Sequence, residues 1–159
     1  MHRLLLLIAL LAPARPAAAA GGRLALFDFE LVNSSLEPTR PDETARLAAL
    51  GPVARQLLTE GAGYEIVDTA PAEAEVAKLS SLRGCNGCEL RLAHDLGADL
   101  AGIGWVQKVS NLILNINLQV RDVATGRLVH AGSVDIRGNT DESWRRGIVY
   151  LLQRRILPQ

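Results

Sequence analysis

The sequence lacks an excess of either charge, because its 159 residues include 17 lysines and arginines and 17 aspartates and glutamates. It also lacks, beyond residue 20, any stretch long and apolar enough to span a bilayer. Nucleic acids and anionic membranes attract proteins through a strongly basic surface, which a near-neutral chain does not offer. The composition therefore argues against nucleic-acid binding and against a stable membrane span in the exported form.

Motifs typical of enzymes are absent as well. The chain contains no G-x-S-x-G nucleophile elbow, no P-loop, no G-x-G-x-x-G after the first expected strand and no H-E-x-x-H. A closed zinc site needs four ligands, and beyond residue 20 only His94 and His130 are available to join the two cysteines. We therefore expect no cofactor and no metal, and the sequence favours a protein without catalytic activity of its own.

The first 20 residues are predicted to be a secretory signal peptide. A basic start is followed by the nine-residue apolar run Leu4–Ala12, and the small residues before Gly21 suit signal peptidase cleavage after Ala20. A membrane anchor is the alternative, although a span takes roughly 20 apolar residues. Cleavage would leave one domain, residues 21–159, with 15 basic and 17 acidic residues and a net charge of −2. We expect this domain in a bacterial periplasm.

Hydrophobic periodicity predicts alternating strands and helices. Strands are expected at 23–29, 64–68, 100–109, 112–121 and 128–136, and helices from about 42, at 72–82, at 89–96 and from 141. Residues 30–41 are expected to form a loop, and Gly51-Pro52 to kink or divide the first helix. The order β-α-β-α-α-β-β-β-α predicts an α/β (α+β) fold, with a mixed sheet of about five strands that ends in an antiparallel meander and carries packed helices.

Two further expectations concern local structure. Asn139 is predicted to be the N-cap of the last helix, in a capping box with Glu142. Gly102 and Gly104 lie inside a strand pattern, where glycine allows a neighbouring element to approach closely.

The element order resembles the small α/β domain found at the start of TolB and in curli-secretion and penicillin-binding-protein-activator lipoproteins. Four more specific stretches are Asp28–Glu30, Leu96–Asp99, Val106–Asn117 and Ile136–Arg146. They resemble small secreted proteobacterial proteins catalogued as domains of unknown function 2380 and 3280, over nearly all of residues 21–159. The resemblance implies a periplasmic protein without an assigned activity or cofactor. Because some relatives are encoded near quinoprotein alcohol dehydrogenases, it also implies an accessory role in periplasmic oxidation.

Cys85 and Cys88 form the sequence R-G-C-N-G-C-E. In an exported chain, two cysteines this close are expected to form a structural disulfide. Thiol–disulfide exchange is the alternative, because a thiol near a helix N-terminus has a lowered pKa, but the tryptophan that precedes the pair in thioredoxin-like proteins is missing. Attachment of a metal or a partner is the third option, and Glu89 replaces the histidine of a haem-binding C-x-x-C-H.

The clearest alternation in the chain lies at residues 112–121. Apolar residues at even positions predict one buried face, and the wet face carries Asn115, Asn117, Gln119 and Arg121. Asparagine is disfavoured in strands, so two on one face suggest a surface that binds a sugar, a peptide or a partner protein. A solvated outer face is the alternative. Trp105 on the same face would favour binding, because aromatic and amide groups together suit recognition.

Three weaker candidates remain. Arg137 and Asn139 surround the turn before the last helix, where capping competes with a binding role. Asp28 and Glu30 end the first strand, where α/β sheets often bind ligands, although capping or pairing with an arginine is the simpler interpretation. The last helix carries two arginine pairs, which are expected to be solvated or, alternatively, to dock a partner: Arg145, Arg146, Arg154 and Arg155.

The leading hypothesis is therefore a periplasmic accessory or binding protein that acts on another periplasmic or envelope protein through the wet sheet face. A thiol–disulfide protein using Cys85 and Cys88 is the alternative from a different class. An enzyme using Asp28 and Glu30 is a third.

Overall fold

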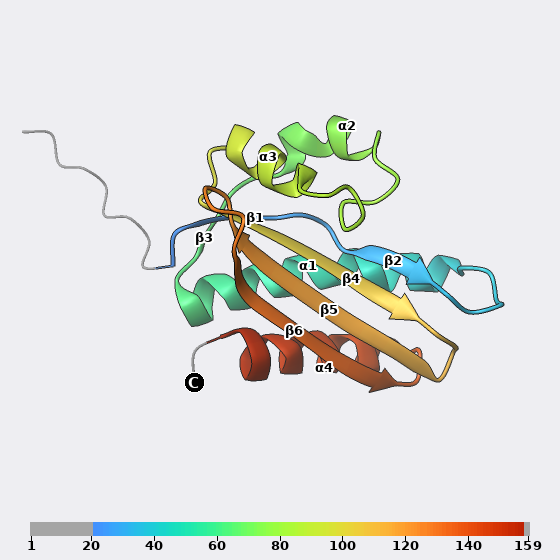
Figure 1. Ribbon diagram of the computed structural model, residues 1–159. Coiled ribbons are helices and arrows are strands. Elements are labelled where there is room, and N and C mark those ends of the chain that lie inside the picture. Colours follow the sequence, from blue (N-terminus) through green and yellow to red (C-terminus); the bar gives the residue numbers. More distant parts are fainter. Residues whose placement is uncertain (1–20, 158–159) are drawn as a thin grey trace, which may run out of the picture.

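A six-stranded mixed sheet runs through the molecule (Figure 1). The structure is a computed structural model that describes residues 21–157, so the predicted signal peptide lies outside the described residues. The strands are β1 (Arg23–Leu26), β2 (Glu30–Asn33), β3 (Glu65–Ile66), β4 (Leu100–Lys108), β5 (Ile113–Asp122) and β6 (Leu128–Arg137). Their order is β3-β1-β4-β5-β6, and β2 extends the line of β1 along β4. The predicted fold class is confirmed.

The predicted antiparallel meander is formed by β4, β5 and β6. The other pairs are parallel: β1 lies between β3 and β4, and β2 pairs with β4. The prediction of a loop at 30–41 was wrong at its start, because residues 30–33 form β2 beside Trp105–Lys108. Between β1 and β2, the ring of Phe29 packs so closely on Gly104 that a Cβ there would clash with it. The expected close approach at this glycine is confirmed.

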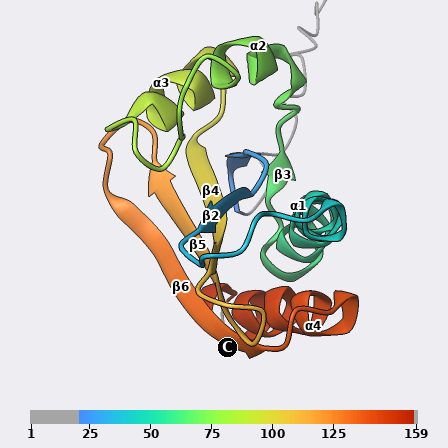
Figure 2. The ribbon, with the colours of Figure 1, turned by 90° about the vertical axis from the view of Figure 1, so that its right-hand side faces the viewer.

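The helices cover the two faces of the sheet unequally (Figure 2). One face is covered by α1 (Pro41–Ala62) and α4 (Asp141–Leu151), which continues into a π-helical turn at Leu152–Ile156. On the other face, a 3-10 turn at Ala70–Ala72, α2 (Glu73–Val76) and α3 (Cys88–Asp95) cover only one end. The larger apolar core lies under α1 and α4, and a smaller one lies under α2 and α3.

The first helix is continuous for 22 residues, so the division into two shorter helices, one of the two outcomes expected at Gly51-Pro52, does not occur. Pro52 is exposed, whereas Leu50, Ala54 and Leu58 are buried on both sides of it. Packing of this apolar face outweighs the backbone hydrogen bond that proline removes. In contrast, β3 and α2 are shorter than predicted, at two and four residues.

The predicted capping box of α4 was wrong by one residue. Thr140, and not Asn139, is the N-cap: its hydroxyl accepts from the backbone N–H of Ser143 at 3.2 Å, and the Ser143 hydroxyl accepts from the N–H of Thr140 at 3.1 Å. Asn139 is drawn into a tertiary network instead. The apolar residues that α4 and the turn after it bury against the sheet are Trp144, Ile148, Leu151 and Leu152. Within residues 21–157, no helix combines the length and apolar character needed to cross a bilayer.

Candidate functional site

The part of the sheet that α2 and α3 leave uncovered carries a row of polar side chains. We call it the open face, defined by Trp105, Gln107, Asn115, Asn117, Gln119, Ser133 and Asp135. In the register of the sheet, Trp105 lies opposite Asn117, and Asn117 lies opposite Ser133. Trp105 therefore lies on the same face as the asparagines, the arrangement that would favour binding.

The side chains of the open face differ in how many of their hydrogen-bonding groups already have a partner within the protein. The Asn115 amide donates to the Asp135 carboxylate at 2.8 Å, and its oxygen accepts from the Ser133 hydroxyl at 3.0 Å. The Asn117 amide makes one long bond, 3.4 Å, to the backbone carbonyl of Asn115. Within the described part of the chain, Gln119 and the indole N–H of Trp105 have no hydrogen-bond partner. Asn117, Gln119 and Trp105 therefore offer the polar groups best able to bind a ligand.

Arg121, the last member of the predicted row, anchors a neighbouring element. It donates to the Glu89 carboxylate at 2.6 Å and to the carbonyl of Gly126 at 3.0 Å. Glu89 is buried, with 3% of its surface exposed, so this bond joins α3 to β5 where water is largely excluded. The sequence analysis missed Glu89 because an acidic residue in the first turn of a helix is normally explained by the helix dipole.

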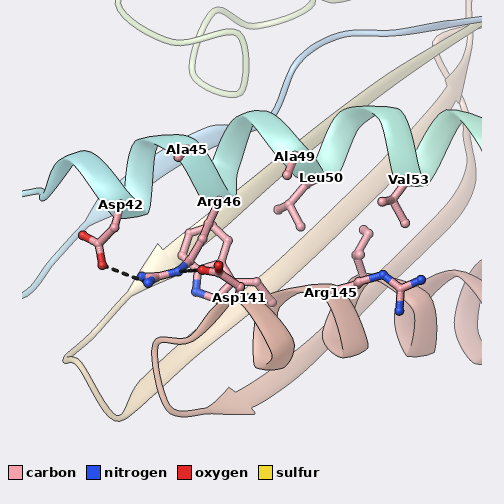
Figure 3. A pocket seen from close by; sticks show the side chains of 10 residues that line it. Asp42, Ala45, Arg46, Ala49, Leu50, Val53, Asp141 and Arg145 are labelled. Atoms are coloured by element: carbon pink, nitrogen blue, oxygen red, sulfur yellow. Dashed lines mark hydrogen bonds and ion pairs between the residues drawn. The ribbon is translucent and has the colours of Figure 1, made fainter.

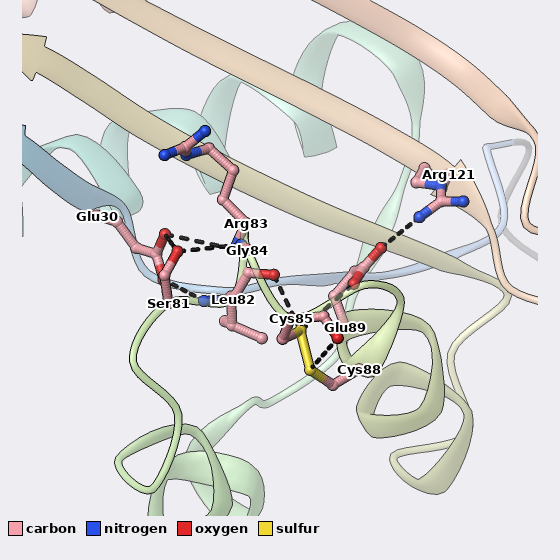
Figure 4. The surroundings of a disulfide bond; sticks show 9 residues. All are labelled: Glu30, Ser81, Leu82, Arg83, Gly84, Cys85, Cys88, Glu89 and Arg121. Atoms are coloured by element: carbon pink, nitrogen blue, oxygen red, sulfur yellow. Dashed lines mark hydrogen bonds and ion pairs between the residues drawn. A yellow bond between two sulfur atoms is a disulfide. The ribbon is translucent and has the colours of Figure 1, made fainter.

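The loop that carries the disulfide is anchored to the sheet on two sides (Figure 4). Cys85 and Cys88 are joined in a disulfide, and Cys88 is the first residue of α3. A second anchor lies on the other side of the loop, where the Glu30 carboxylate accepts from the Ser81 hydroxyl at 2.8 Å and from the backbone N–H of Leu82. The loop is thus held to β2 by Glu30 and to β5 through Glu89.

This anchoring places Arg83 over the open face. The backbone N–H of Arg83 lies 3.4 Å from the Glu30 carboxylate, and its guanidinium carbon lies 5.5 Å from the centre of the Trp105 ring. Such a cation–π contact stabilises by about 0.5–1 kcal/mol at an exposed site. Arg83, which the sequence analysis did not single out, therefore joins Trp105 as part of the candidate site.

Asp28 and Glu30, the predicted carboxylate pair, do not converge on one point. Asp28 pairs with Arg55 at 2.6 Å, and Glu30 accepts from residues 81–83. These are the capping and pairing roles that the simpler interpretation predicted.

Arg137 and Asn139, although only two positions apart in the chain, lie in different surroundings. Arg137 is exposed on β6, whereas Asn139 lies on the covered side of the sheet. Its amide donates to Glu43 at 2.6 Å, and its oxygen accepts from the Trp144 indole at 2.8 Å and from Arg46 at 3.2 Å. Asn139 therefore joins α1 to α4, and its polar groups are used within the protein.

Glu43 also forms a buried ion pair with Lys108. Their atoms lie 2.6 Å apart, and both side chains are inaccessible to solvent. Burial alone would raise the pKa of Glu43, but bonds from Lys108, the Arg40 backbone N–H and Asn139 outweigh it and lower the pKa below its ordinary value. This cluster fixes the N-terminus of α1 against β4.

A shallow groove of about 380 Å³ lies between α1 and α4 (Figure 3). Leu50 and Val53 point into it from α1. At one end, Arg46 pairs with Asp141 at 2.6 Å and with Asp42 at 2.9 Å. Ligand sites combine apolar walls with a few polar groups that are free to fix a ligand. Here Arg46, Asp42 and Asp141 are paired with one another and, within residues 21–157, only the Arg145 side chain is unpaired, so the open face is the better candidate.

The fold is that of a small group of known α/β domains. The PelC dodecamer from Paraburkholderia phytofirmans is similar with a TM-score of 0.56 at 16% identity, over 91% of this chain and 94% of that chain. The LpoB C-terminal domain from Salmonella enterica gives 0.52 at 16% identity, over 76% of this chain and 86% of that one. The NMR structure of E. coli LpoB gives a TM-score of 0.54 at 16% identity, over 77% of this chain and 60% of that chain. At these identities the likeness shows the fold alone.

The amino-acid sequence, unlike the fold, also shows the family. Residues 22–156 match DUF3280, described as "Protein of unknown function (DUF2380)", so the chain belongs to this family. The predicted family is confirmed. No curated protein matches the chain.

Proposed function

We propose that this protein is a non-enzymatic accessory protein of the bacterial periplasm, and that its open face binds another envelope protein. The observation that carries the proposal is the position of Arg83, held over Trp105 beside the available amides of Asn117 and Gln119. An enzyme would need an available nucleophile or acid–base pair at such a site. On the open face the Ser133 hydroxyl and the Asp135 carboxylate are both hydrogen-bonded to Asn115, and the groups that remain available are amides, an indole and a guanidinium.

Tryptophan and arginine are the side chains most enriched among the energetic centres of protein interfaces. The amides beside them add hydrogen bonds that select the partner. Because the disulfide and the two carboxylate anchors already hold the loop in place, little conformational entropy is lost when a partner binds. A fixed aromatic and polar surface of this kind supports recognition of a folded protein.

The periplasmic location rests on the predicted signal peptide and on the disulfide, which is typical of oxidising compartments. The family resemblance supplies the first partner to test, a quinoprotein alcohol dehydrogenase. In this version of the proposal, the protein assists a periplasmic oxidation system without taking part in its chemistry.

Site-specific photo-crosslinking tests the proposal. A photoreactive amino acid is introduced at Asn117 and, as a matched control, at Ala48, which is exposed on α1 on the other side of the sheet. We expect one defined adduct in the envelope fraction from position 117 and none from position 48. Equal labelling at both positions, or no adduct at position 117, would contradict the proposal.

A thiol–disulfide function is the second candidate, because the half-buried Cys88 is the first residue of α3, and reactive cysteines are commonly found at helix N-termini. Equilibration with glutathione buffers, followed by alkylation and mass spectrometry, gives the potential of the pair. A potential below about −300 mV indicates a structural disulfide, whereas about −120 to −230 mV is the range of oxidoreductases. The accessory function predicts the first result.

A further inference from the structure

The outer edge of β6 pairs with no other strand within residues 21–157, because β6 is the last strand of the sheet (Figure 2). It is ten residues long and contains neither proline nor lysine, the residues that commonly protect such edges. Leu128 and Val129 at its start are 56% and 44% exposed. The edge therefore presents unpaired backbone donors and acceptors beside exposed apolar side chains.

A cleft of about 920 Å³ runs along this edge, between β6 and α4. Val134, Val149 and the half-exposed Tyr150 contribute apolar surface to it. The charged residues that line it are one carboxylate, Asp135, and five arginines: Arg137, Arg145, Arg146, Arg154 and Arg155. The cleft is thus strongly basic, although the chain as a whole is neutral.

These arginines are largely unpaired. Arg146 forms an exposed ion pair with Glu142 at 3.1 Å. The side chains of the other four make no ion pair or hydrogen bond with any residue in the described range. Like charges gathered without counter-charges repel one another, and an anionic ligand would relieve that repulsion. The unpaired arginines therefore indicate an acidic partner.

The spacing of the arginines matches an extended chain. The pairs Arg145–Arg146 and Arg154–Arg155 are nine residues apart, or about 13 Å along a helix. Four residues of a β-strand cover about the same distance. The helix runs back along β6, since Gly147 lies next to Ile136 and Gly132 lies next to Arg155. A strand added beside β6 would therefore place carboxylates four residues apart near both pairs.

We propose that β6 and α4 form a second docking surface, which binds an extended acidic segment of a partner protein as an additional strand. The unpaired backbone of β6 supplies the main-chain hydrogen bonds, and the arginines of α4 select for carboxylates. The open strand edge and the apolar residues beside it favour a polypeptide over an anionic polysaccharide or a lipid headgroup. This surface uses the edge of the sheet and shares only Ser133 and Asp135 with the open face, which the accessory function proposed above uses.

A fluorescent eight-residue peptide of alternating glutamate and valine tests the proposal by anisotropy with the purified protein. The same peptide N-methylated at every residue keeps its charges but has lost the backbone N–H donors that strand pairing needs on either edge. We expect the first peptide to bind and the methylated peptide to bind weakly or not at all. Amide hydrogen exchange in β6 is expected to slow when the first peptide binds.

The variant Arg154→Glu with Arg155→Glu should weaken binding of the acidic peptide about tenfold or more. Arg91→Glu, a charge reversal on exposed α3, and Asn117→Thr, on the open face, should leave it unchanged. Equal binding of the methylated peptide, unchanged β6 exchange, or displacement of the peptide by phosphatidylglycerol vesicles would overturn the strand-docking proposal. None of these outcomes bears on the open face, because its crosslinking test is independent.

Discussion

The two faces of the sheet use polar residues in opposite ways. On the covered face, Glu43, Lys108 and Asn139 lie beneath α1 and α4, and the Glu43 carboxylate lies 2.6 Å from the Lys108 ammonium and 2.6 Å from the Asn139 amide. On the open face, Asn117 and Gln119 leave most of their hydrogen-bonding capacity unused. A polar cluster that is closed on itself holds elements together, whereas one that remains open is available to a partner.

The largest effect should follow from breaking the closed cluster. In Lys108→Met the buried Glu43 carboxylate loses its nearest counter-charge and keeps, among the described residues, only Arg40 at 4.0 Å, and we expect a loss of about 3–5 kcal/mol in the free energy of unfolding. Urea denaturation measures it. The control Lys78→Met removes an exposed lysine paired with Glu75 and should leave stability unchanged. A loss under about 1 kcal/mol in Lys108→Met would show that the covered face does not depend on this pair.

The disulfide beside the open face should contribute less. Its loop holds only the residues from Cys85 to Cys88, so its removal in Cys85→Ser with Cys88→Ser should cost about 2 kcal/mol. Glu30 and Glu89 still anchor the segment in this variant, so the Trp105 environment, followed by tryptophan fluorescence, should change little. If the cysteine variant lost more free energy of unfolding than Lys108→Met, the disulfide beside the open face would contribute more to stability than the closed cluster of the covered face.

The pH dependence should also come from the closed cluster. Because the pKa of Glu43 is lower in the folded protein than its ordinary value of 4.5, its contribution to stability is fully present above pH 4.5. That contribution decreases as the pH falls through the folded pKa, since the unfolded state then binds more protons. Urea midpoints measured between pH 6 and pH 3 should therefore fall less steeply in Glu43→Gln than in the original protein. If the urea midpoints of the two proteins fell equally steeply with pH, Glu43 would not be the cause of the pH dependence.

The smallest effect on stability is expected on the open face. Asn117→Thr replaces a residue disfavoured in strands and breaks only one long hydrogen bond, so the free energy of unfolding should change by less than about 0.5 kcal/mol. Asn115→Thr should cost more, up to about 1 kcal/mol, because it removes the bonds to Asp135 and Ser133. Equal losses in the free energy of unfolding would mean that Asn115 is no more tightly held by hydrogen bonds than Asn117.

How far the sequence predicts the structure differs between the two faces. Alternation at residues 112–121 was sufficient to predict β5 and its wet face, because the period of a strand is a local property. The cluster around Asn139 could not be predicted, because Glu43 lies 96 residues away and capping gave a complete local explanation. The strand β2 was missed for the same reason, since the pairing of residues 30–33 with β4 is a tertiary contact.

The dissociation constant for the partner captured at position 117 tests the central claim most directly. It should be compared among the original protein, Asn117→Thr with Gln119→Thr, and the control Gln56→Ala on exposed α1. The account predicts binding about tenfold or more weaker in the open-face variant, with unchanged unfolding and with the control equal to the original. Equal affinity of all three proteins would contradict the claim that the open face binds the partner.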